Sequence, residues 1–156
     1  MNRLMHHLDR LIFLAGFIVA LSALLSVFSY DQEAFAGYEV VFGVEIFDLD
    51  PFGIGSFASA HLPFSLVGLV AFAFPLVGGV LVLVGKRYVF IAAGLFIVSV
   101  VMFILLRDAT EIVYTIGGGE QTETVDWTLE IGYYLGITAS LAGALLSVLG
   151  LMKNVK

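Results

Sequence analysis

The segment IGYYLGITASLAGALLSVLGLM (residues 131–152) decides the fold that the sequence predicts. It contains no Asp, Glu, Lys or Arg. Its length matches the roughly 20 residues that a helix needs to cross a ~30 Å hydrocarbon core. Small residues recur on one face at helical spacing, which allows helix backbones to approach closely in a membrane. This face consists of Gly132, Gly136, Ser140, Gly143, Ala144 and Ser147.

Three further apolar runs of similar length lie at residues 11–30, 62–85 and 88–106. The chain is 60% hydrophobic and 13% charged, whereas a soluble domain has roughly 25% charged residues. We therefore expect an all-α membrane protein with a single integral domain. Its predicted fold is a four-helix transmembrane bundle, with a small extracytoplasmic β-rich cap formed by outer loops 31–61 and 107–130.

Two features in the other runs concern helix packing. The first run has a shorter stripe of small residues, including Gly16 and Ala20. This stripe and that of residues 131–152 pack either inside one bundle or against another subunit, and we expect the first. In the second run, Pro75 removes a backbone hydrogen bond and predicts a kink.

The distribution of basic residues predicts the orientation. Of the seven Lys and Arg residues, all except Arg107 fall on one side of the predicted spans. The positive-inside rule makes this side cytoplasmic, so we expect both termini in the cytoplasm of a cell or plasma membrane protein. The residues that determine this topology are Arg3, Arg10, Lys86, Arg87, Lys153 and Lys156.

The two outer loops contain β-like segments. The glycine-rich stretch TIGGGEQTE (residues 115–123) lacks the Lys-Ser/Thr pair of a phosphate-binding loop, and alternating polar and apolar residues follow it. It therefore predicts a β-hairpin. Residues 38–47 of the first loop are β-branched and aromatic, and predict one or two strands with a bulge or bend at Gly43.

This layout resembles that of the claudin-like tetraspan proteins. The shared features are four spans, both ends inside, a long first outer loop with strands and a shorter second loop. The resemblance is one of topology, because the chain has no cysteine and its single tryptophan, Trp127, lies in the second loop. It implies an adhesive, scaffolding or accessory role.

Charged residues of the outer loops give several candidate contacts. Asp48 and Asp50 place two carboxylates on one side of an extended segment, but calcium needs further oxygen ligands. We expect a solvated acidic surface, with no metal or other cofactor. The acidity also excludes nucleic acid as a partner. Arg107 pairs either with Asp108, Glu111 or Glu130 or with lipid headgroups, and Trp127 is expected at the outer interface.

The predicted spans contain no ionisable residue of the kind used by pumps and intramembrane enzymes. We therefore expect no enzymatic activity. The function that we expect is that of a non-catalytic accessory, scaffold or adhesion-type subunit. It would bind other membrane proteins, or further copies of itself, through its outer loops and a helix face. The alternative is an oligomeric channel or transporter for small or apolar solutes, lined by the small residues of the fourth span.

Overall fold

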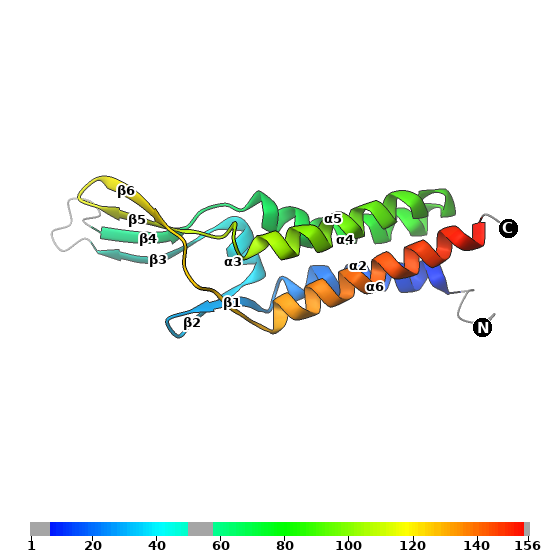
Figure 1. Ribbon diagram of the computed structural model, residues 1–156, viewed down its shortest axis with the longest axis horizontal. Helices are drawn as coiled ribbons and strands as arrows, with labels where there is room; N and C mark the ends of the chain where they lie inside the picture. The colour runs from blue at the N-terminus through cyan, green and yellow to red at the C-terminus, as the bar shows by residue number, and fades with distance from the viewer. Residues whose placement is uncertain (1–6, 50–57, 155–156) are drawn as a thin grey trace.

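A computed structural model describes residues 7–49 and 58–154 of the chain, without the side chains of residues 153 and 154. The molecule is elongated, with its helices at one end and its strands at the other (Figure 1). The helices are α2 (Leu8–Ser22), α3 (Gly37–Phe42), α4 (Leu66–Val84), α5 (Val89–Leu106) and α6 (Ile131–Asn154), and a turn of 3₁₀ helix, η1 (Lys86–Tyr88), joins α4 to α5.

The strands form two antiparallel sheets. The strands are β1 (Ser26–Tyr30), β2 (Glu33–Ala36), β3 (Val44–Leu49), β4 (Ala58–Leu62), β5 (Ile112–Ile116), β6 (Gly119–Glu123) and β7 (Thr128–Leu129). One sheet has the order β2-β1-β7 and the other has the order β3-β4-β5-β6. The expected all-α fold of four transmembrane helices is therefore wrong. Among the described residues, only α4, α5 with η1, and α6 are long and apolar enough to cross a membrane.

The first apolar run was misread as a single helix. Helix α2 ends at Ser22, after 15 residues, which span about 22 Å at 1.5 Å per residue and fall short of a ~30 Å core. Three backbone bonds of the 3₁₀ type then tighten residues 23–25 into a turn. The rest of the run is strand β1, whose Val27 and Phe28 are fully buried. A buried strand and a buried helix have the same hydropathy, so the run did not distinguish them.

The first loop also differs from the prediction, because residues 37–42 form helix α3 instead of a strand. The Glu39 carboxylate accepts a hydrogen bond of 2.8 Å from the backbone N–H of Ala36 and caps the first turn. Val40 and Val41 are buried in the core. Gly43 ends the helix with φ of 85°, a conformation that favours glycine. These tertiary contacts outweigh the β propensity of the valines.

A hairpin at the predicted glycine turn is confirmed, but its second strand, β6, ends at Glu123. The alternating residues that predicted this strand lie after it, and the last two of them form β7 of the other sheet. Strands β5 and β6 pair in antiparallel register from Ile112 opposite Glu123 to Ile116 opposite Gly119. The connecting residues Gly117 and Gly118 both have positive φ, as a two-residue turn between twisted strands requires. In the first loop, only the part after Gly43 is extended, as strand β3.

The four longer helices pack side by side, with α4 and α6 each in contact with both α2 and α5. Close approach depends on glycine. A Cβ atom on Gly16 of α2 would overlap the backbone carbonyl of Pro75 in α4, and one on Gly79 would lie 2.9 Å from the Phe13 Cα atom. Helix α4 continues through Pro75 as one helix. At the end remote from the sheets, Gly150 of α6 lies against Leu8 and Val89.

Candidate functional site at the strand end

The small-residue face of α6 is covered by the chain's own helices. A Cβ atom on Gly132 would lie 2.7 Å from the Ser26 carbonyl oxygen, and one on Gly136 would lie 2.5 Å from the Phe103 ring. A Cβ atom on Gly143 would overlap the ring of Phe96. Ser140 and Ser147 are fully buried, and Ala144 is half-buried. The glycines and serines of this face are therefore packed against other parts of the same chain.

A buried polar contact joins three helices behind this face. Pro75 has no N–H, so the carbonyl of Ala71 lacks its helical partner. The hydroxyl of Ser99 in α5 donates to this carbonyl instead, at 2.6 Å. The Ser140 hydroxyl of α6 lies 3.0 Å from the Ser99 oxygen. Because the Ser99 proton is used, Ser140 is the donor of this second bond. The contact therefore provides hydrogen-bond partners for groups that are buried between the helices.

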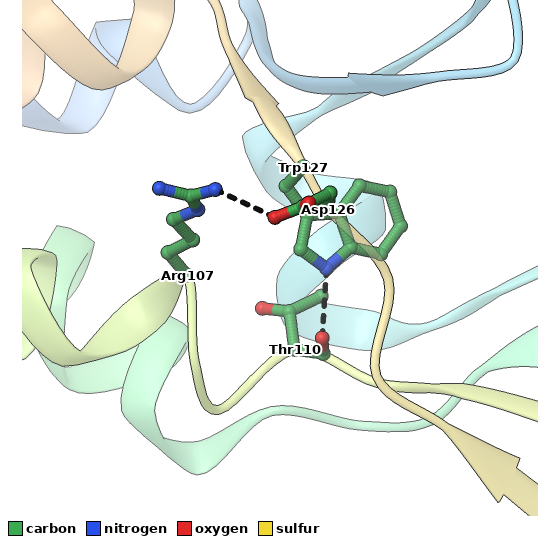
Figure 2. Close-up of polar contacts among 4 residues, drawn as sticks. All are labelled: Arg107, Thr110, Asp126 and Trp127. Atoms are coloured by element: carbon green, nitrogen blue, oxygen red, sulfur yellow. Dashed lines mark hydrogen bonds and ion pairs between the residues drawn. The ribbon is translucent and has the colours of Figure 1, made fainter.

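Trp127 fixes the strand end to the bundle. Its side chain is 2% exposed, and its indole N–H donates to the Thr110 carbonyl oxygen at 2.8 Å (Figure 2). The ring packs against Phe28, Tyr30 and Phe35, with centroid distances of 5.6–5.9 Å. The sequence placed this residue at a membrane interface, whereas the structure places it inside a protein core. The β1–β2 hairpin is thus held over the end of the helices.

Arg107 lies at the end of α5 and extends toward Asp126, as Figure 2 shows. Its guanidinium donates to the Asp126 carboxylate at 3.0 Å, and both side chains are exposed. The expected partners Asp108, Glu111 and Glu130 are not those used. Instead, the Glu130 carboxylate accepts a 2.6 Å bond from the Ser29 hydroxyl. Beside the ion pair lies an open, mostly polar cavity of about 540 Å³, lined by Arg107, Asp108, Thr110, Thr124, Val125 and Asp126.

The four-stranded sheet has one apolar and one polar face. Phe47, Ala60 and Tyr114 lie opposite one another on β3, β4 and β5, so their side chains share a face. Asp48 and Ser59 are paired on the other face, as are Glu45 and His61. The candidate residue Asp48 is exposed there. Within the described residues, no group of three His, Asp or Glu side chains is placed to hold a metal ion.

The apolar face meets the β1–β2 hairpin in a half-open cavity of about 220 Å³, which we call the intersheet groove. Four aromatic side chains and two carboxylates contribute to its walls. The residues that line it are Tyr30, Asp31, Glu33, Phe35, Ile46, Phe47, Ala60, Ile112 and Tyr114. Asp31 and Gln32 form the hairpin turn with φ of 48° and 72°, a left-handed conformation that is uncommon outside glycine.

The electrostatic environment of the groove is negative. Burial raises the pKa of the Tyr114 hydroxyl, and the nearby Glu123 carboxylate and Tyr30 raise it further. No Lys or Arg occurs in any strand of either sheet. The carboxylates of Asp31 and Glu33 therefore have no Lys or Arg neighbour within the sheets.

Sequence reasoning missed the groove. Phe47 and Tyr114 are separated by many residues and come together only through the pairing of β3, β4 and β5. The available signal was the β-branched and aromatic run of residues 112–116, which as a strand puts Ile112 and Tyr114 on the same side. Arg3, Asp50 and Lys156 lie outside the described residues, as does the side chain of Lys153. Ala20 is half-buried in α2.

No protein-family model, curated protein or solved structure matches this chain.

Proposed function

We propose that this protein is a non-catalytic membrane subunit that binds other membrane proteins, chiefly through its strand end. The observation that carries the proposal is the covered face of α6. The small residues that would line a pore are packed against Ser22, Phe96 and Phe103 of the same chain. The alternative, a channel lined by this face, needs those residues to be open to a solute.

The surface of the helices supports a lipid environment. Large apolar side chains point outward along the bundle, among them Leu14, Val80, Ile104 and Leu145, each at least 44% exposed. Such a surface is unfavourable in water and favourable against lipid tails. We propose that lipid covers these positions, with one outward helix face available to a neighbouring membrane protein.

The proposed orientation follows from the charges. Arg10, Lys86 and Arg87 lie in α2 and η1 at the end remote from the sheets. The positive-inside rule favours the cytoplasm for this end, together with both ends of the chain. In this proposal α2 therefore crosses the membrane together with the turn at residues 23–25, although its 15 helical residues alone are too short. The strand end then faces outward, where Arg107 is the only Lys or Arg among the described residues. In this proposed arrangement the strands lie outside the cell, as they do in the claudin-like proteins that the predicted topology resembles.

The strand end is the structured polar surface on which a partner would act. It combines exposed carboxylates with two open cavities and a β1–β2 hairpin anchored through Trp127. Partner recognition of this kind requires a rigid surface with apolar anchors and a polar rim. The cytoplasmic η1 turn of three residues offers no comparable area.

The test is gentle extraction of the full chain from its native membrane, followed by native mass spectrometry. We expect a stoichiometric complex with another membrane protein. Recovery of a pure homo-oligomer, with solute flux after reconstitution in liposomes, would support the channel and contradict the proposal. The double variant Phe47→Ala/Tyr114→Ala tests the binding surface. It removes two large side chains of the strand end and should weaken the complex.

A further inference from the structure

We infer that the intersheet groove binds a basic side chain, an arginine or lysine, from an extracytoplasmic segment of the partner protein. The inference deepens the proposed function and rests on it. It specifies the chemistry by which the strand end recognises its partner.

The size of the groove indicates a side chain as occupant. Its volume of about 220 Å³ lies below the roughly 300–1,000 Å³ that is typical of sites for drug-sized ligands. One long side chain with an apolar stem fits this space. Ile46, Ala60 and Ile112 line the groove and supply apolar contacts for such a stem.

The walls select a cation. Tyr30, Phe35, Phe47 and Tyr114 contribute aromatic rings, and ring faces attract guanidinium and ammonium groups. Phe35 is 6% exposed and Phe47 is 40% exposed, so one wall is fixed and the other remains accessible. Packing of Tyr30 and Phe35 on Trp127 holds the fixed wall in place.

The charges are complementary to the same occupant. Asp31 and Glu33 line the groove from the β1–β2 hairpin, and Glu123 lies near enough to Tyr114 to raise the pKa of its hydroxyl. Neither sheet contains a Lys or Arg that could neutralise these carboxylates. An incoming cation would therefore meet acceptors that have no competing partner in the sheets, which favours specific docking.

The binding test uses the full chain in zwitterionic lipid nanodiscs with isotope-labelled isoleucine methyl groups. The probe is the capped peptide Gly-Leu-Arg-Leu-Gly, and the matched control peptide has citrulline in place of arginine, which removes the charge and keeps the shape. We expect saturable shifts of the Ile46 and Ile112 methyl resonances with the arginine peptide. Equal binding of both peptides, or the absence of saturable shifts, would overturn the inference.

A charge variant tests the assigned carboxylates. In Asp31→Asn/Glu33→Gln the sizes of the side chains are kept, and asparagine tolerates the positive φ of position 31. We expect affinity for the arginine peptide to fall about tenfold, since two exposed ion pairs are each worth a few-fold. The control Asp48→Asn removes a carboxylate from the face of the four-stranded sheet that points away from the groove and should leave the affinity unchanged. An equal loss in both variants would overturn the assignment.

The inference and the proposed function fail separately. If the native complex forms at full occupancy with Asp31→Asn/Glu33→Gln, the groove does not recognise the partner, and the proposed function stands. If the unaltered chain yields no complex with another protein, the proposed function fails, whatever the peptide shows.

Discussion

In the helical bundle, buried hydroxyls are hydrogen-bonded within the chain, as Ser22, Ser99 and Ser140 illustrate. At the strand end, by contrast, the carboxylates of Asp31 and Asp48 are exposed, and aromatic rings line an open groove. The hydroxyls of the bundle are thus satisfied within or between its own helices, whereas the carboxylates that line the intersheet groove are open to a partner. Substitutions in the bundle should therefore change stability, and substitutions in the groove should change binding.

The joint between the two regions should show the largest effect. Trp127→Ala removes a side chain that is 2% exposed and deletes its bond to Thr110. Truncation of such a buried ring costs about 3–5 kcal/mol of unfolding free energy. Denaturant unfolding in detergent, followed by circular dichroism, would measure it. Tyr134→Ala, at a position 55% exposed, is the control, and equal losses would contradict the anchoring role.

The next largest effect should come from the contact of α6 with the turn after α2. In Gly132→Ala, the new Cβ atom would meet the carbonyl oxygens of Ser22, Leu25 and Ser26 at 2.7–3.0 Å. Backbone atoms cannot move away as side chains do. We therefore expect the free energy of unfolding to fall by about 3 kcal/mol, the upper end of the usual range for overpacking. Gly94→Ala is the control, because its new Cβ atom would have no neighbouring atom within 4 Å. It should leave the melting temperature unchanged or raise it.

A smaller effect is expected at the buried serine contact. Ser99→Ala leaves the Ala71 carbonyl without a donor, which costs about 1–3 kcal/mol. Alanine at position 75 supplies a backbone N–H for the same carbonyl. The double variant Pro75→Ala/Ser99→Ala should therefore lose less stability than the sum of the two single variants. Strict additivity in this cycle would show that Pro75 and Ser99 are not coupled.

The exposed ion pair should matter less than any buried contact. Arg107→Gln and Asp126→Asn each remove one charge of the 3.0 Å ion pair, but water and salt screen both groups. We expect a shift of the unfolding midpoint smaller than that of Ser99→Ala and a further decrease of this shift in high salt. A shift as large as that of Ser99→Ala would assign Arg107 a structural role at the strand end.

The smallest effect concerns pH. The pKa of Tyr114 is raised above 10.0 in the folded protein, first by burial and then by Glu123 and Tyr30. The neutral phenol is thus favoured by folding, and its contribution to stability is complete below pH 10.0 and decreases as the pH rises through the folded-state pKa. Tyr114→Phe should lose less stability than the parent chain in this alkaline range. Identical alkaline unfolding curves would contradict the shift.

The helices α4, α5 and α6 were predictable, because each is apolar over a length that only a long helix explains. The turn of the β5–β6 hairpin was also predictable, since its glycines are a local signal, but β6 itself (Gly119–Glu123) comes before the alternating residues on which the prediction rested. Strand β1 was not, because burial makes its residues as apolar as those of α2. Local sequence also favoured a strand where Glu39 and Gly43 produce helix α3.

The contacts that define the candidate site are long-range. Arg107 pairs with a residue 19 positions away, and Ser99 with a carbonyl 28 positions away. The groove depends on the register of three strands and on a hairpin from another sheet. Periodicity identifies the face of one element, and it contains no information about which faces meet. This is why the small-residue face of α6 was found in the sequence and the groove was not.

The most direct test of the account is photo-cross-linking in the native membrane. A benzophenone amino acid would replace either Phe47, in the groove, or Leu145, which is 67% exposed on α6. We expect a cross-link from position 47 to a distinct membrane protein, and we expect less of this cross-link when Asp31→Asn/Glu33→Gln is added. A cross-link from position 145 with none from position 47 would contradict the claim that the strand end is the main binding surface.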